Sequence, residues 1–230
     1  MFLNALTTTC GAQISSLILD KSNLEKNTIG FDSHYYAFCR NLITLLGFSK
    51  VLRTLSFASC NMSKEAVLAI GEGLQKNTKL TSLNLKGNQI TFGGLTELIN
   101  AFYENRRLSL KHLDLSVNSI CDEAGVELSR CLTNLKKLET INLKNNSLGF
   151  DSSDSLLFLV KENHTICKCN VELNMIKYAS IVEIEKTCKQ NKQVMSTIDL
   201  PKIKKEIKGL KRLRCKESCK IEDLNSKVEY

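Results

Sequence analysis

Apolar residues recur along this chain in a spacing that is neither the period of a helix nor the alternation of a plain strand. In residues 80–90 they occupy the first, fourth, sixth and eleventh places, and Asn88 occupies the ninth. Six stretches share this arrangement, and they begin at Ile14, Leu52, Leu80, Leu110, Leu138 and Ile166. Successive starts are 38, 28, 30, 28 and 28 residues apart. This nearly constant step predicts a chain of repeated structural units.

The intervals between these stretches predict helices. After Ile90, the apolar residues Leu95, Leu98 and Phe102 are three or four positions apart, which is the spacing of one helix face. An asparagine follows each expected helix and could adopt the left-handed conformation that ends it, at Asn77, Asn105, Asn134 and Asn163. Each unit should therefore be a strand, a turn, a helix and a turn, with parallel strands and the helices outside.

The six stretches resemble the leucine-rich repeat, L-x-x-L-x-L-x-x-N-x-L, and the 28-residue step resembles its ribonuclease-inhibitor class over roughly residues 14–176. This resemblance implies an α/β solenoid, or horseshoe, of about six strand-helix units with a parallel concave sheet, followed by a C-terminal helical tail. The ninth-place asparagines are expected to bond loop backbone groups, at Asn88, Asn118, Asn146 and Asn174. The long first step predicts a longer or displaced helix over 31–47.

The domain organisation expected from the pattern has three parts. Residues 1–13 form an N-terminal cap, 14–192 the solenoid with a short capping helix around Ile181–Cys188, and 193–230 a basic helical tail. Residues 194–199 are expected to be a linker, and Pro201 suits the first turn of a helix. That helix has apolar heptad positions interrupted at Arg214 and Glu217, so it could equally dock on a partner or on the solenoid.

The charge of the chain is concentrated in the tail. Of 32 Lys and Arg and 24 Asp and Glu, residues 177–230 hold 14 and 8, which is +6 of the net +8. We expect the tail to contact an acidic surface, unless it is only a solvated lysine-rich helix. The expected contact residues are Lys202, Lys204, Lys205, Lys208, Lys211, Arg212 and Arg214.

Ten cysteines without a signal-peptide pattern, several of them at expected core positions, indicate a reduced protein of the cytoplasm. No apolar stretch approaches the length of a transmembrane helix, so no membrane insertion is expected.

The third, fifth and seventh places of each repeat should point to the concave face. The expected protein-binding residues there are Ser82, Asn84, Lys86, His112, Asp114, Asn142, Lys144 and Asn170. This mixed, mostly uncharged surface suits a protein or peptide better than a phosphate backbone, which would need rows of Lys and Arg. Ordinary solvated strand residues are the alternative interpretation.

Recognisable catalytic motifs are missing from the sequence. The three histidines form no H-x-x-x-H pair, and neither a phosphate-binding loop nor a G-x-G-x-x-G fingerprint occurs. His164, Cys167 and Cys169 could suggest zinc, with Cys188 or the pair Cys215 and Cys219. Because Cys167 and Cys169 should face opposite ways, we expect no metal. Because the catalytic and phosphate-binding motifs are missing, we expect no cofactor, no small-molecule substrate and no enzyme activity.

The resemblance narrows the function to a few classes. Ribonuclease inhibitors are acidic and have more repeats, and the activator of the Ran GTPase has an acidic tail. Tropomodulin-like actin-capping domains are nearer, as are small leucine-rich proteins of ciliary axonemes, which the ending 171–186 resembles. We expect a non-enzymatic scaffold subunit of a large cytoskeletal assembly, such as a ciliary axoneme, that binds one or more proteins. The alternatives are a nucleic-acid-associated protein that uses the basic helix and a regulator of an enzyme such as a small GTPase.

Overall fold

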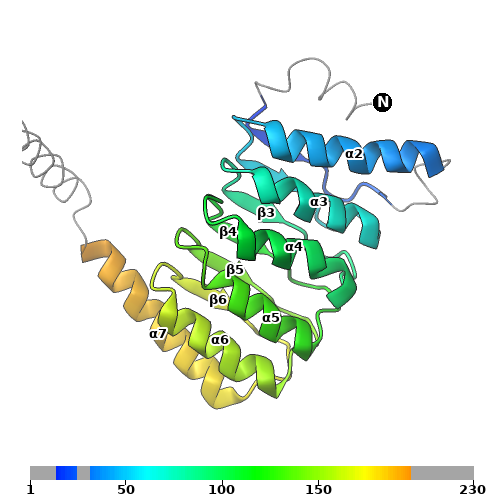
Figure 1. Ribbon diagram of the computed structural model, residues 1–230. Coiled ribbons are helices and arrows are strands. Elements are labelled where there is room, and N and C mark those ends of the chain that lie inside the picture. Colours follow the sequence, from blue (N-terminus) through cyan, green and yellow to red (C-terminus); the bar gives the residue numbers. More distant parts are fainter. Residues whose placement is uncertain (1–13, 25–31, 198–230) are drawn as a thin grey trace, which may run out of the picture. The chain divides into compact units, whose positions relative to one another are not determined.

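The computed structural model describes residues 14–24 and 32–197, which form six strands and six helices (Figure 1). In chain order these are β1 (Ser16–Ile18), α2 (Asp32–Phe48), β2 (Thr54–Ser56), α3 (Lys64–Lys76), β3 (Ser82–Asn84), α4 (Phe92–Glu104), β4 (His112–Asp114), α5 (Asp122–Leu132), β5 (Thr140–Asn142), α6 (Phe150–Glu162), β6 (Lys168–Asn170) and α7 (Tyr178–Thr197).

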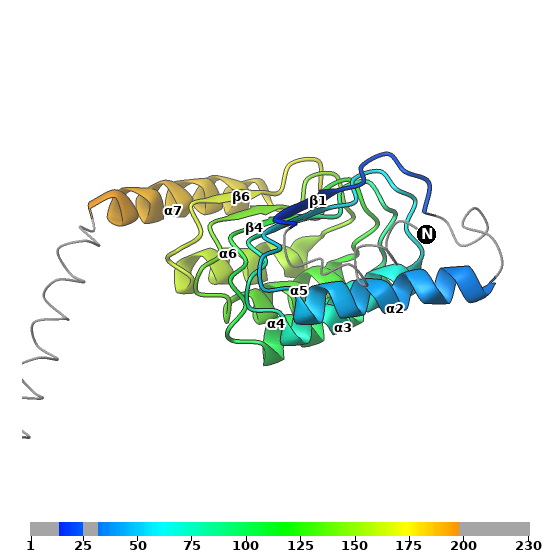
Figure 2. The ribbon, with the colours of Figure 1, turned by 90° about the horizontal axis from the view of Figure 1, so that it is seen from above.

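The strands form one parallel sheet in the order β1 to β6. The register pairs equal places of successive units, so that Leu83 lies beside Leu113. Helices α2 to α6 form a second layer on one face of this sheet (Figures 1 and 2). The α/β solenoid of strand-helix units is therefore confirmed.

The core lies between the sheet and the helix layer. The repeat leucines are almost completely buried, and Leu80, Leu83 and Leu85 are each 1% exposed or less. Helices α3 and α4 approach closely at Gly71, where a Cβ atom would lie 2.4 Å from the backbone carbonyl carbon of Glu97. Substituting a larger residue there would force the two helices apart.

Ninth-place asparagines connect neighbouring units, as the sequence predicts. The Asn88 side chain is 2% exposed, and its amide nitrogen donates to the carbonyls of Phe57 and Leu85 at 2.8 and 3.0 Å. Its oxygen accepts from the amides of Cys60 and Met62 at 3.0 and 3.2 Å. One side chain therefore satisfies backbone groups of two units that the sheet leaves unpaired.

The prediction that asparagines end the helices in a left-handed conformation is wrong. Asn77, Asn105 and Asn163 have φ of −74°, −87° and −105°. They are buried instead, and the Asn105 amide donates to the carbonyls of Leu74 and Asn77 at 2.7 and 2.6 Å. The physical reason is that the C-terminal carbonyls of one helix need donors, and the next unit supplies them.

Two expectations concern the ends of the repeat region. Helix α2 has 17 residues, against 11 to 13 in α3 to α6, which confirms the longer first helix. Helix α7 continues to Thr197, so the predicted linker is wrong for 194–197, where no proline or glycine interrupts the helix.

The chain divides into two compact units, residues 1–192 and 193–230, and only 193–197 of the second are described. The predicted cap 1–13 and the tail contacts from Lys202 to Arg214 lie outside the described residues. In the described part, no helix combines the length and the apolar character that a membrane crossing requires.

Candidate functional site

A hollow of about 350 Å³ lies on the face of the sheet that carries the odd-numbered repeat places. Strands β3 to β6 all contribute to it, with Leu83, Leu113 and Ile141 among its apolar residues. Six of the eight residues predicted for protein binding line it, namely Ser82, Asn84, His112, Asp114, Asn142 and Asn170. We call this the concave hollow. The structure therefore brings most of the predicted residues together in one place.

Side chains at the fifth place are held by the backbone that follows them. The side-chain oxygen of Asn84 accepts from the amide of Lys86 at 3.1 Å, and that of Asp114 accepts from the amide of Ser116 at 2.9 Å. Asn142 and Asn170 make the same contact two residues on, at 3.3 and 3.1 Å. This turn geometry fixes where each side chain points.

Hydrogen bonds between strands order the hollow further. The second carboxylate oxygen of Asp114 accepts from the Asn142 amide nitrogen at 3.0 Å. Nδ1 of His112 lies 2.9 Å from the Thr140 hydroxyl oxygen. The polar surface is therefore arranged before a partner arrives, which reduces the entropy lost on binding.

Lys86 and Lys144, the two remaining predicted residues, do not line the hollow. The Lys144 ammonium pairs with the Glu172 carboxylate at 2.6 Å on the adjacent rim. The hydrogen bond from Lys144 lowers the pKa of Glu172 below its ordinary value. Both groups are solvated, so this pair contributes little to stability.

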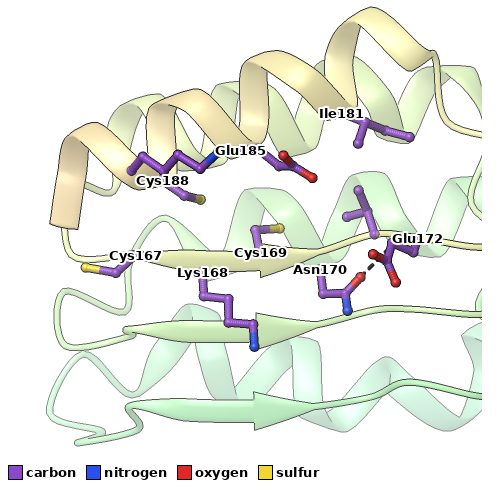
Figure 3. A pocket seen from close by; sticks show the side chains of 10 residues that line it. Cys167, Lys168, Cys169, Asn170, Glu172, Ile181, Glu185 and Cys188 are labelled. Carbon is purple, nitrogen blue, oxygen red and sulfur yellow. Dashed lines mark hydrogen bonds between the residues drawn. The ribbon is translucent and has the colours of Figure 1, made fainter.

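A second hollow, which the sequence did not reveal, lies between β6 and α7 and has a volume of about 230 Å³ (Figure 3). Cys167, Cys169 and Cys188 all line it. Burial raises the pKa of the Cys188 thiol to about 11 and also raises that of Cys169. These thiols are therefore protonated at neutral pH and are poor nucleophiles.

The geometry of these cysteines bears on the zinc motif. Figure 3 shows the Cys169 sulfur directed toward α7 and the Cys167 sulfur directed sideways, so the two thiols point in different directions. Cys169 is buried and Cys167 is partly exposed, which agrees with the repeat register. Within residues 14–24 and 32–197, no three His, Cys, Asp or Glu side chains are grouped so that they could hold a metal ion.

Comparison with known proteins agrees with the repeat architecture. The family model described as Leucine Rich repeat matches residues 76–98. RAN GTPase-activating protein 2 of Arabidopsis thaliana is 24% identical over 141 residues, which are 60% of this chain and 26% of that protein. Leucine-rich repeat-containing protein 41 of Mus musculus is 28% identical over 118 residues, 50% of this chain and 15% of that protein. The chain thus spans about a quarter or less of these relatives.

A solved structure shares the fold over most of its length. The tropomodulin C-terminal domain of Caenorhabditis elegans superposes with a TM-score of 0.59 at 14% identity, covering 69% of this chain and 95% of that domain. At this identity the similarity is one of fold. The repeats, the observed fold and these matches identify the chain as a leucine-rich-repeat protein.

Proposed function

We propose that the chain is a non-enzymatic scaffold subunit that holds another protein of a cytoskeletal assembly in the concave hollow. The observation that carries the proposal is that eight odd-place residues from four adjacent strands line that hollow, six of them predicted from the sequence. Polar side chains that hydrogen bonds fix before binding suit the surface of a folded partner. Among the described residues, Lys168 is the only lysine that lines the hollow, which disfavours a nucleic-acid backbone.

A binding role fits the chemistry of the hollow better than catalysis does. The His112 ring contacts the Thr140 hydroxyl, but His112 is exposed at the surface of the sheet and lies in no enclosed site. In the described part of the chain, no third group orients this imidazole as a nucleophile–base pair would require.

The cytoskeletal part of the proposal rests on the resemblance to tropomodulin-like and axonemal leucine-rich proteins. Filaments of actin and microtubules are therefore the first partners to test. We expect the full chain to sediment with one of these filaments. Ser82→Arg or His112→Glu should weaken the affinity for that filament at least tenfold, because each substitution places bulk or charge in the hollow.

Thr96→Arg is the matched control for this experiment, since Thr96 is an exposed residue of α4 in the helix layer. It should bind filaments as the unchanged protein does. The proposal would be refuted by a chain that sediments with neither filament, or by equal losses in Ser82→Arg and Thr96→Arg.

Regulation of a small GTPase is a second candidate, because one matched relative is named as an activator of RAN. Its test is GTP hydrolysis by a Ran-class GTPase with and without an equimolar amount of the full chain. A stimulated rate that is lost in Ser82→Arg would favour this candidate over the scaffold.

A further inference from the structure

Charge is unevenly distributed over the repeat region, although its total is close to neutral. Residues 1–176 hold 18 Lys and Arg and 16 Asp and Glu. Helices α2 to α6 carry 11 of these acids and 5 of these cations. The connections from each helix to the next strand carry eight of the cations and one acid, and they are 49–53, 77–81, 105–111, 133–139 and 163–167. The five strand-to-helix connections between 57 and 177 carry only three cations and one acid, so positive charge is concentrated on one rim of the solenoid.

The helix-to-strand connections lie against one another and bring their cations into one row. The Thr81 amide donates to the Arg53 carbonyl at 2.8 Å, and the Lys111 amide donates to the Thr81 carbonyl at 2.8 Å. The Glu139 amide donates to the Lys111 carbonyl at 2.8 Å, so four successive connections are joined. We call this row the basic rim, and its cations are Lys50, Arg53, Lys79, Arg106, Arg107, Lys111, Lys136 and Lys137.

Most cations of the basic rim lack a partner among the described residues. Lys111 pairs with Glu139 at 2.5 Å, and Lys137 donates to the Ser109 hydroxyl at 3.0 Å. Five other side chains make no hydrogen bond and no ion pair with any residue of 14–24 and 32–197, and they belong to Lys50, Lys79, Arg106, Arg107 and Lys136. A helix C-terminus attracts cations through its free carbonyls, but none of these five side chains donates to one. The cations are therefore available to an anionic partner.

Two of the unpaired cations come from an insertion in the repeat. The step from the third to the fourth repeat is 30 residues, against 28 for the steps on either side. Helices α3 and α4 have 13 residues each, so the two extra residues lie in the connection 105–111, which has seven residues where 77–81 has five. Arg106 and Arg107 in this connection are both exposed. The preceding unit packs with the shorter connection, so the insertion serves the surface rather than the core.

A carboxylate fits between adjacent connections of the rim. The Glu139 carboxylate comes from one connection and pairs with Lys111 of the connection before it. Arginine binds a carboxylate through two parallel N–H groups, so Arg106 and Arg107 suit the same kind of ligand. The chemistry of the rim therefore matches an acidic side chain.

Two features favour an acidic polypeptide over a nucleic acid. The rim is narrow, because the last residues of α4 and α6, Glu104 and Glu162, are exposed where these helices enter it. A double helix with its two phosphate strands is wide enough to bring phosphates against these carboxylates. The five connections contain no Phe, Tyr or Trp on which the bases of a single strand could stack.

We propose that the basic rim binds an extended acidic segment of a partner protein. Neighbouring units are about 4.8 Å apart at the strands and about 8–10 Å apart at the helices, so the four charged connections span roughly 15–30 Å. An extended chain rises about 3.3 Å per residue, so about five to nine residues cross them. The residues of the rim do not line the concave hollow, so the chain can hold a folded partner in the hollow and an acidic segment on the rim.

The test uses the full chain labelled with ¹⁵N and a capped, fluorescent peptide of eight glutamates, in about 0.15 M salt. The amide resonances of the four charged connections should shift most on binding. Arg106→Glu together with Arg107→Glu should weaken binding, measured by fluorescence anisotropy, at least tenfold. Replacing the same two arginines by glutamine should give an intermediate loss, because it removes the charge without reversing it. Both variants should melt as the unchanged chain does, since the two residues are exposed in a connection.

Arg40→Glu together with Lys64→Glu is the matched control, because it makes the same change of charge at exposed helix residues outside the rim. The Debye length is about 8 Å at this salt, so the control should weaken binding less than about threefold. Asn142→Leu, an uncharged change in the concave hollow, should leave peptide binding unchanged, which separates the rim from the hollow.

The basic tail must be separated from the rim, because it also carries lysines. Changing Lys204, Lys205, Lys208 and Lys211 to alanine should cost less peptide affinity than the arginine-to-glutamate pair does. A larger loss in this tail variant would overturn the proposal, as would the largest resonance shifts lying outside the four connections, or equal losses in the arginine pair and its matched control. A peptide of eight glutamines that binds as tightly would also overturn it. Tighter binding of an eight-nucleotide RNA or of phosphatidylserine vesicles would do the same, because the ligand would then be a nucleic acid or a membrane.

Discussion

Replacing Asn88 by alanine tests the side-chain hydrogen bonds that join one repeat to the next. The side chain lies in the third of the six units, is 2% exposed and bonds backbone groups on both sides of a unit boundary. Asn88→Ala keeps the backbone conformation available but removes both the donor and the acceptor. The surrounding loop is close-packed, so no other side chain can easily move in to replace this donor and acceptor.

The expected loss follows from the groups left unpaired. The amides of Cys60 and Met62 lose their acceptor, and the Phe57 carbonyl loses a donor at 2.8 Å. A buried group without a partner costs about 1–3 kcal/mol. Since water can reach part of an enlarged site, we expect about 3–5 kcal/mol of lost stability, which is a large part of the roughly 5–15 kcal/mol of a typical domain.

Urea denaturation followed by circular dichroism measures this loss. Asn84→Ala is the matched control, because Asn84 makes one hydrogen bond, to the Lys86 amide, at the surface of the sheet. It should cost under about 1 kcal/mol. Asn88→Cys should be intermediate, since Cys60 holds the same place one unit earlier and its thiol donates to the Leu19 carbonyl. A loss below about 1 kcal/mol in Asn88→Ala would refute the reasoning.

Three further predictions concern charge. Partial burial raises the pKa of Asp122, but hydrogen bonds from Ser152, Gly149 and Asp151 at the start of α6 lower it more, so the net shift is downward. The stability that this carboxylate contributes is present above its unfolded pKa of about 3.9 and is lost as pH falls through the lower folded value. Asp122→Asn should therefore be less stable at pH 7, and the difference should shrink in denaturation curves taken at acid pH. Leu113→Asp places a charge at a 2%-exposed core position and should cost several kcal/mol; an unchanged melting curve would contradict the repeat register. Changing Lys204, Lys205, Lys208 and Lys211 together to alanine should leave melting unchanged and weaken capture of partners from native extract, whereas unaffected capture would contradict a contact through these lysines.

The repeated part of the fold could be predicted because each unit uses the same residue types at the same places for the same contacts. Leucines at fixed places and Asn88 at the ninth place recur every 28 to 30 residues, and both roles depend only on neighbouring units. The concave residues followed from the same register, since alternate strand positions face one side. The sequence did not show that Asn84 and Asp114 also bond the loop that follows them.

The role of the asparagines that follow the helices, Asn77, Asn105 and Asn163, could not be assigned in this way, because asparagine serves equally as a local turn residue and as a donor to a neighbouring helix. One signal was available in the spacing. Asn77 and Asn105 are 28 residues apart, as are Asn163 and Asn191, and Asn191 in α7 donates to the carbonyls of Val160 and Ile166 at 3.0 Å. These asparagine hydrogen bonds between units therefore continue into α7, although the leucine pattern has ended.

Backbone strain was also hidden from sequence reasoning. Every eighth-place residue has positive φ, including Val117 at 57° and Leu173 at 55°, where a glycine or asparagine would be expected. The Val117 amide donates to the Lys144 carbonyl at 2.8 Å, and this bond between units holds a conformation that valine rarely adopts. The hollow between β6 and α7 likewise had no signal in the sequence, because α7 follows the last repeat.

Site-specific photocrosslinking tests the central proposal most directly. A photoreactive residue replaces Ser82 in the concave hollow or Thr96 in the helix layer of the full chain, and each protein is irradiated in a cytoskeletal extract. The proposed function predicts that a cytoskeletal protein is crosslinked from position 82 and not from position 96. Crosslinks of equal yield from both positions, or none from position 82, would contradict it.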